Sequence, residues 1–199
     1  MNQNFIARHR IAISKVFFLG IISVALFTSP LLPAEQGFRL ATLLIASGFV
    51  IIAVLGRLWC SLYLCGYKTS TLIDVGPFSI VRNPLYLFSF MGATGIGIAT
   101  TSIVITLLLI AFFIVIYPSV IANEEKRLAT ALGHQYQAYL ECTPRLIPDF
   151  KLYKGVDQYT VNMRQVHSAF MDVVWFFVAL GCALLVPILN DAQILPLLV

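Results

Sequence analysis

Two separated stretches of the chain carry most of the side chains that could do chemistry together. The first is GPFSIVRNPLY, residues 76–86. Its Gly-Pro pair marks a turn, Asn83 is biased away from helical geometry by the following proline, and Pro84 suits the first turn of a helix. A polar turn at a helix N-terminus can bind an anion, and Arg82 can pair with a carboxylate in a bidentate manner. The alternative is a capped helix start in which Arg82 is only a snorkelling anchor.

The second stretch is EEKRLATALGHQYQAYLECTPRLIP, residues 124–148. Leucine and tyrosine side chains recur every four positions after Glu124, which predicts one amphipathic helix that ends before Pro144. Glu124 and Glu125 lie in its first turn, where the helix dipole favours negative charge. The alternative is an interfacial helix with surface charges and tyrosine anchors. That alternative accounts for the stripe, but less well for the acidic pair, the glycine at 133 and the closing Pro-Arg.

Metal chemistry finds little support in the sequence. His134 has no partner at ligand spacing, and Cys60 and Cys65 are separated by four residues, which is neither a zinc nor a thioredoxin pattern. We therefore expect no metal site.

The composition indicates what must position these two stretches. Hydrophobic residues make up 59% of the 199 residues and charged residues only 11%, whereas soluble domains carry about a quarter charged residues. The apolar residues also fall in long blocks, as in membrane proteins. We predict an all-α, polytopic integral membrane protein, with residues 1–199 as a single membrane domain. The basic residues flank apolar blocks, so anionic lipids, and not nucleic acid, are the expected partners.

The apolar blocks predict about five transmembrane helices plus a cytoplasmic amphipathic segment. The first block is read as a retained span because no small-residue cleavage site follows it. The third is too long for one span and is broken near residues 99–102, which fits a hairpin of two shorter helices. The expected spans are Ile11–Leu32, Phe38–Leu58 with an extension as far as Leu64, the hairpin Leu85–Tyr117, and Ala169–Leu189.

The basic residues predict the orientation of these spans. With a cytoplasmic N-terminus, all of the 13 lysines and arginines except Arg39 lie on the cytoplasmic side, which satisfies the positive-inside rule. The tail from Asn190 then ends outside. The segments 67–86 and 121–168 share the cytoplasmic face, so they can meet. Asp172 lies at the cytoplasmic edge of the last span, and the lack of ionisable residues at mid-membrane argues against an ion-coupled transporter.

Together the two stretches resemble the isoprenylcysteine carboxyl methyltransferase family and its bacterial relatives. That family shows G-P-Y/F-x-x-x-R-H/N-P-x-Y, a short helical hairpin, E-E-x-x-L-x-x-x-F-G-x-x-Y-x-x-Y and a Pro-Arg/Pro close. The resemblance covers about residues 57–148. The matching residues are Gly76, Pro77, Phe78, Arg82, Asn83, Pro84, Tyr86, Glu124, Glu125, Leu128, Gly133, Tyr136, Tyr139, Pro144, Arg145 and Pro148.

The chain also departs from this family in three places. Asn83 stands where many members have histidine, Leu132 stands where many have phenylalanine, and residues 121–123 lack the basic residues that eukaryotic members carry before the acidic pair. The methyl acceptor therefore stays open among a lipophilic carboxylate, amine or thiol.

The resemblance implies a membrane-embedded methyltransferase that binds S-adenosylmethionine on the cytosolic side without a Rossmann fold, and the sequence has no G-x-G-x-x-G. It implies a bacterial inner-membrane location and a lipid or lipophilic small molecule that enters from the bilayer. A non-enzymatic membrane scaffold or accessory subunit is the alternative. The expected catalytic residues are Arg82, Glu124 and Arg145, and the expected cofactor-binding residues are Asn83, Pro84, Tyr86, Glu124, Glu125, Leu128, Tyr136 and Tyr139.

If the chain is such a methyltransferase, its charged residues have expected roles. The glutamates would hold the ammonium group or ribose hydroxyls of the cofactor. Arg145 would hold a carboxylate of the cofactor or of the substrate. Because the cofactor has one carboxylate, we expect Arg82 and Arg145 to divide cofactor and acceptor between them.

Overall fold

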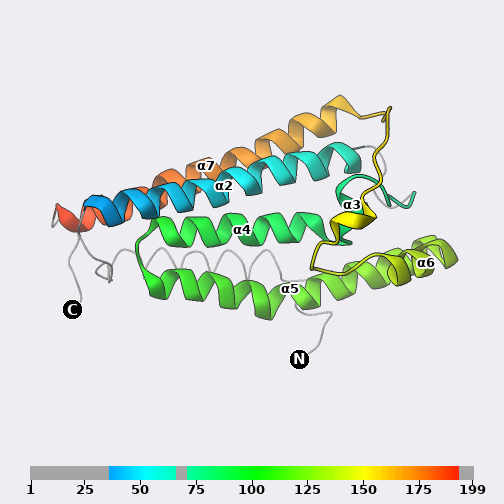
Figure 1. Cartoon of the computed structure of the whole chain (residues 1–199), viewed down its shortest axis with the longest axis horizontal. Helices are drawn as coiled ribbons and strands as arrows, with labels where there is room; N and C mark the ends of the chain where they lie inside the picture. The colour runs from blue at the N-terminus through cyan, green and yellow to red at the C-terminus, as the bar shows by residue number, and fades with distance from the viewer. Residues whose placement is uncertain (1–35, 66–70, 193–199) are drawn as a thin grey trace.

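The computed structural model describes residues 36–65 and 71–192, and this part of the chain is helical without strands (Figure 1). The expected first span, Ile11–Leu32, lies outside the described residues. In chain order the elements are α2 (Gln36–Leu64), α3 (Pro77–Ile80), α4 (Pro84–Ala99), α5 (Ile103–Leu132), α6 (His134–Cys142), the 3-10 turn η1 (Phe150–Leu152) and α7 (Met163–Asp191).

Three of the described helices, α2, α5 and α7, are long and apolar enough to cross a membrane. The apolar helix α4 has 16 residues and rises only about 24 Å. Large apolar side chains point outward from the long helices, among them Leu44, Val115 and Trp175, each more than 60% exposed. Outward apolar surface on this scale suits a lipid environment. The all-α membrane fold predicted from the sequence is thus confirmed.

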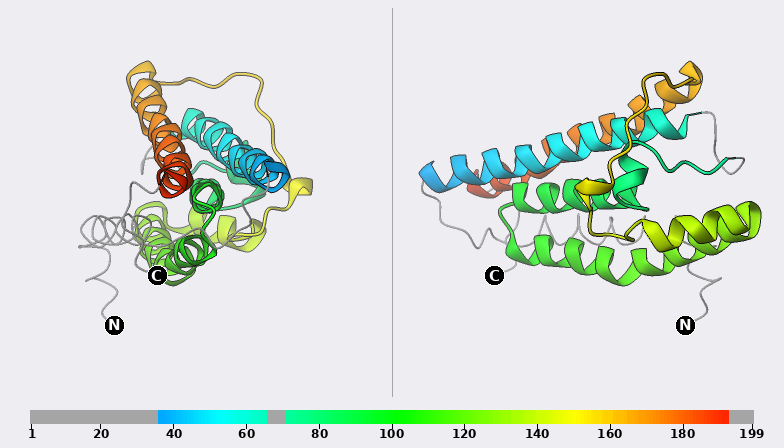
Figure 2. Two further views of the ribbon diagram at one scale, coloured as in Figure 1. Left: turned by 90° about the vertical axis from the view of Figure 1, so that its left-hand side faces the viewer. Right: turned by 45° about the vertical axis from the view of Figure 1, so that its right-hand side comes forward.

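Helix α4 lies at the centre of the bundle and packs against α2, α5 and α7. The end-on view in Figure 2 shows α2 and α7 on one side of α4 and α5 on the other. Small residues allow the close approach of α4 and α2: a Cβ atom on Gly95 would lie 2.8 Å from the carbonyl oxygen of Ala46. This is the packing mode of membrane helices, in which small residues let backbones approach.

The predicted hairpin break is confirmed at residues 100–102. Ser102 caps α5, because its hydroxyl accepts a hydrogen bond from the amide N–H of Ile105, and Thr101 adopts a positive φ of 56°. Both helices of the hairpin were expected to be short. Instead α5 runs for 30 residues through Pro118 to Leu132.

The expectation of one amphipathic helix from Glu124 to Pro144 is wrong. The acidic pair lies within the continuous α5, and a second helix, α6, begins after Gly133. Gly133 has φ 56° and ψ −129°, a conformation open to glycine but costly for other residues. The leucine–tyrosine pattern is periodic on both sides of Gly133, so periodicity alone did not show that the stretch forms two helices.

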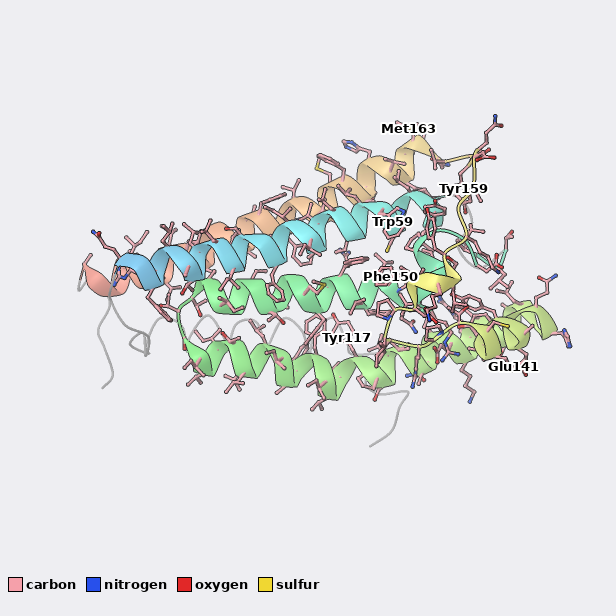
Figure 3. All side chains as sticks on the ribbon, in the orientation of Figure 1. Trp59, Tyr117, Glu141, Phe150, Tyr159 and Met163 are labelled. Atoms are coloured by element: carbon pink, nitrogen blue, oxygen red, sulfur yellow. The ribbon has the colours of Figure 1, made fainter. Side chains whose placement is uncertain are left out.

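Polar side chains gather at the end of the bundle where α3, α6 and η1 lie. Figure 3 shows most of the nitrogen and oxygen atoms there, with Glu141 and Tyr159 among the labelled residues. The segment after α6 returns across this end to reach α7. It pairs with the loop before α4, because the amide of Arg82 donates to the carbonyl of Pro144 and that of Asp149 donates to the carbonyl of Ile80. The two sequence stretches are therefore joined through their backbones.

Candidate functional site

A cavity of about 870 Å³ lies where α2, α4, α5 and α6 meet the loop before α3. Its volume is in the range of small-molecule and cofactor sites. The polar side chains that line it are Arg57, Thr71, Arg82, Asn83, Tyr86, Asn123, Glu124, Glu125, Arg127, Tyr136 and Tyr139. The apolar lining is Leu64, Leu72, Ile73, Phe78, Pro84, Leu85, Val120, Leu128 and Leu132.

Glu124 is held on the cavity wall by a tyrosine of the facing helix. The hydroxyl of Tyr86 on α4 donates a 2.6 Å hydrogen bond to Glu124 Oε2 on α5. The Tyr86 ring meets Tyr117 edge-on, with centroids 5.3 Å apart, and Figure 3 labels Tyr117 in the layer between α4 and α5. Within the described residues Glu124 lies in no ion pair, so its carboxylate keeps acceptor capacity for a ligand.

Glu125 is the centre of the charge network beside this pair. Its Oε1 accepts a 3.2 Å hydrogen bond from the Asn83 side-chain amide and lies 3.6 Å from Arg82 Nε. Its Oε2 lies 3.2 Å from Arg145 Nε. The Asn83 amide also donates to the Arg145 carbonyl. Glu125 and Arg82 are largely buried, whereas the Arg145 side chain is 40% exposed. One carboxylate therefore joins α5, the turn before α4 and the segment after α6.

The two arginines have hydrogen-bonding capacity left. The buried Nε atoms of Arg82 and Arg145 lie at ion-pair distance from Glu125 but make no hydrogen bond of acceptable geometry. Buried donors are rarely left unsatisfied in native structures, and such exceptions call for a ligand, a water or a role in function. Of the two, Arg82 lines the cavity, so a carboxylate placed there would have a donor at its Nε.

Tyr136 and Tyr139 form the α6 side of the cavity. Both are buried, and the hydroxyl of Tyr139 donates a 2.7 Å hydrogen bond to the carbonyl of Phe78. Burial, reinforced by the negative charge of Glu125, raises the pKa of Tyr136 to about 12. Burial likewise raises the pKa of Tyr139. Both phenols are therefore neutral at physiological pH and act as hydrogen-bonding groups, not as bases.

The residues predicted from the sequence are brought together by the fold. All of them line the cavity except Arg145, which contacts the cavity-lining Glu125. Sequence reasoning missed Arg57, Asn123 and Arg127 as lining residues. Arg57 was counted only as a positive charge of the cytoplasmic side, and its position within an apolar block was the available signal for a role in a site.

The donor set fits S-adenosylmethionine chemically. The methionine part of this cofactor is a zwitterion, for which Arg82 offers a cation and Glu124 an anion. The ribose hydroxyls need acceptors, and the adenine needs an apolar wall such as the one near Leu128 and Leu132. Among residues 36–65 and 71–192, no three His, Cys, Asp or Glu side chains gather as a metal site would require.

Comparisons with known proteins place the chain among its relatives. The profile of the phospholipid methyltransferase family matches residues 37–135, from the start of α2 to the start of α6. The cobalt-zinc-cadmium resistance protein CzcN of Cupriavidus metallidurans is 34% identical over 97% of this chain and 88% of its own length. The nickel-cobalt-cadmium resistance protein NccN of Alcaligenes xylosoxydans xylosoxydans is 33% identical over 87% of this chain and 81% of its own.

No solved structure matches the chain significantly. The family profile and the motifs of residues 76–86 and 124–148 agree with each other and with an all-helical membrane fold. The chain belongs to the phospholipid methyltransferase family, of the isoprenylcysteine carboxyl methyltransferase-like kind.

Proposed function

We propose that this protein is an S-adenosylmethionine-dependent methyltransferase that methylates a lipophilic acceptor at the cytoplasmic face of a bacterial inner membrane. One observation carries the proposal: two motifs far apart in sequence close on one cavity, where Tyr86 and Asn83 contact Glu124 and Glu125 directly. Membrane anchors at two separate helix ends have no need of such contacts. The cavity lies at the polar end of apolar helices, where a soluble cofactor and a lipid could both reach it.

In this proposal the cavity residues bind and orient the cofactor. Glu124, fixed by Tyr86, accepts hydrogen bonds from its ammonium group or ribose hydroxyls. Arg82 pairs with its carboxylate through the Nε donor, which makes no hydrogen bond within the described residues. Glu125 and Arg145 hold Arg82 and the adjoining loop in place. Most of the work of catalysis is then positioning in a cavity that excludes water.

When bound, the cofactor would supply an activated methyl group: the acceptor would form a bond to the methyl carbon, and the electron pair of the broken carbon–sulfur bond would stay on sulfur. A carboxylate acceptor is already ionised at neutral pH. An amine or thiol acceptor must lose a proton, and Glu124, which lines the cavity, would take it. Tyr136, with its high pKa, is not a candidate for that task.

A second candidate function comes from the names of the relatives. CzcN and NccN are named as metal resistance proteins. We infer as the alternative that this chain is a non-catalytic membrane subunit of a comparable resistance system. In that case the cavity network would hold the fold together and bind no cofactor.

Calorimetric titration of the full chain in detergent with S-adenosylhomocysteine separates the two functions. A methyltransferase binds this product with a measurable Kd, and Glu124→Gln weakens it by about tenfold or more, since a hydrogen bond to a charged group contributes about 1.5–3 kcal/mol. Glu141→Gln, an exposed carboxylate on α6, is the matched control and should bind like wild type. Absence of binding by folded wild-type protein would leave only the accessory-subunit reading.

A further inference from the structure

Arg57 is a charged residue inside a membrane-spanning helix. Helix α2 continues to Leu64, so Arg57 lies seven residues, or about 10 Å of helix, before its end. The neighbouring Gly56 is covered by the Phe88 ring of α4, which leaves no space for a side chain. The Arg57 side chain reaches α4, where it contacts Ser89 and lines the cavity. Ionisable residues within spans usually mark a functional site.

The protein satisfies Arg57 only in part. Its guanidinium donates a hydrogen bond to the hydroxyl of Ser89 on α4 and lies 5.5 Å from the centre of the Phe176 ring on α7. Its Nε is buried without a hydrogen-bond partner in the described part of the chain. No carboxylate of these residues lies within 4.0 Å, although the exposed Asp172 of α7 attracts it electrostatically from farther away.

The other two arginines of the site differ from Arg57 in this respect. Arg82 and Arg145 both approach the carboxylate of Glu125. Around the cavity, the cations Arg57, Arg82 and Arg127 outnumber the two glutamates by one. With the carboxylate of the cofactor assigned to Arg82, Arg57 is left without a carboxylate within 4.0 Å in the described residues, and its charge favours a second anion in the cavity.

We infer that Arg57 binds the anionic group, a carboxylate or a phosphate, of the lipophilic acceptor; this inference rests on the proposed methyl transfer. The planar guanidinium fork matches either anion in a bidentate manner. The apolar side chains of Leu64, Leu85 and Val120 line the same cavity and accommodate the adjoining hydrocarbon. Arg57 is then a specificity residue for the acceptor, whereas the polar motifs bind the cofactor.

The test compares four C12 amphiphiles on the purified full chain in a neutral maltoside detergent: laurate, dodecyl phosphate, dodecanol and dodecylamine. Thermal stabilisation is measured against the mole fraction of each amphiphile in the micelle, and calorimetry with S-adenosylhomocysteine is run on every variant. The variants are Arg57→Met, Arg57→Lys and the matched control Arg164→Met, which removes an exposed arginine from the start of α7.

We expect laurate or dodecyl phosphate, and neither dodecanol nor dodecylamine, to stabilise the wild-type chain. The half-saturating fraction should rise by about tenfold or more in Arg57→Met and by about threefold in Arg57→Lys, which keeps the charge but loses the fork. Arg164→Met should behave like wild type. The affinity for S-adenosylhomocysteine should change by less than about twofold in all three variants, since no change is made in the cofactor contacts.

Three results would overturn the inference. The first is that, for laurate and for dodecyl phosphate, the half-saturating mole fraction is the same in wild type as in the Arg57 variants. The second is that dodecylamine binds more tightly than either anion, and the third is that the Arg57 variants lose affinity for S-adenosylhomocysteine while laurate binding is unchanged. If Arg57→Met does not fold, the half-saturating fractions of Arg57→Lys are compared with those of wild type in the same way, and this comparison decides the inference. The failure of the proposed function is separate, because it would appear as wild-type protein that binds no S-adenosylhomocysteine. Binding of laurate that depends on Arg57 would still support the anion site in that case.

Discussion

The two adjacent glutamates of α5 should respond in opposite ways to the same substitution. Glu125 lies in the protein's own charge network, between Arg82, Asn83 and Arg145. Glu124 contacts Tyr86 and otherwise faces the cavity. We therefore expect Glu125→Gln to lower chiefly the stability of the fold and Glu124→Gln to lower chiefly the affinity for the cofactor.

The size of the stability effect follows from the exposure of the groups. Breaking a fully buried ion pair costs about 3–5 kcal/mol because an uncompensated charge remains. The side chains of Glu125 and Arg82 are 16% and 14% exposed, but that of Arg145 is 40% exposed and well screened. Because the exposed Glu125–Arg145 pair contributes little, we expect Glu125→Gln to lower the free energy of unfolding by about 2 kcal/mol. For a chain of this size that corresponds to a fall in Tm of roughly 4–8 °C. Glu124→Gln should lower Tm by no more than about 2 °C, because it disrupts no ion pair.

The assay is thermal unfolding of the purified chain in detergent, followed by tryptophan fluorescence, with S-adenosylhomocysteine titrations on the same samples. The exposed-site variant Glu141→Gln sets the baseline. The reasoning would be refuted if Glu124→Gln lowered Tm more than Glu125→Gln, or if Glu125→Gln unfolded at the wild-type temperature.

Three further predictions concern the frame of the site. Gly133→Ala should lower Tm by about 2–8 °C, because φ 56° costs a residue with a Cβ about 1–2 kcal/mol although nothing lies within 4 Å. Gly181→Ala, in open space within α7, should not lower Tm. The pKa of the buried Tyr136 is raised from 10.0 to about 12, so the phenol ionises first in the unfolded chain. The folded state should therefore lose stability as pH rises from 10 to 12. Tyr136→Phe should reduce the fall in Tm over that pH range. Reporter fusions should place the N-terminus in the cytoplasm and the C-terminus outside, and reporters responding on the same side would mean an even number of spans.

The sequence predicted the membrane fold well because its physical basis is local. Long apolar blocks, the break at residues 100–102 and Pro84 at a helix start are each decided within a few residues, and the structure has them as expected. Convergence of the two motifs was also predictable. It required only that both lie on one membrane face, which the distribution of basic residues indicated.

What the sequence could not give was the pairing of charges across the cavity. Arg82 and Arg145 were expected to serve separate anions, but both approach Glu125, a contact that depends on how the segment after α6 folds back. Whether they also divide cofactor and acceptor stays a prediction. Arg57 was counted among the basic residues of the cytoplasmic side because the extent of the second span beyond Leu58 was open. The continuation of α2 to Leu64 places Arg57 seven residues before the end of the helix, where it lines the cavity.

The most direct measurement is methyl transfer itself. The purified chain in lipid nanodiscs is incubated with S-adenosylmethionine labelled in its methyl group and with a total lipid extract, and label in the organic phase is counted over time. The account predicts label in a lipophilic product with wild-type protein and with Glu141→Gln, and a loss of about tenfold or more with Glu124→Gln. A folded wild-type chain that transfers no label to any lipid fraction and binds no S-adenosylhomocysteine would contradict it.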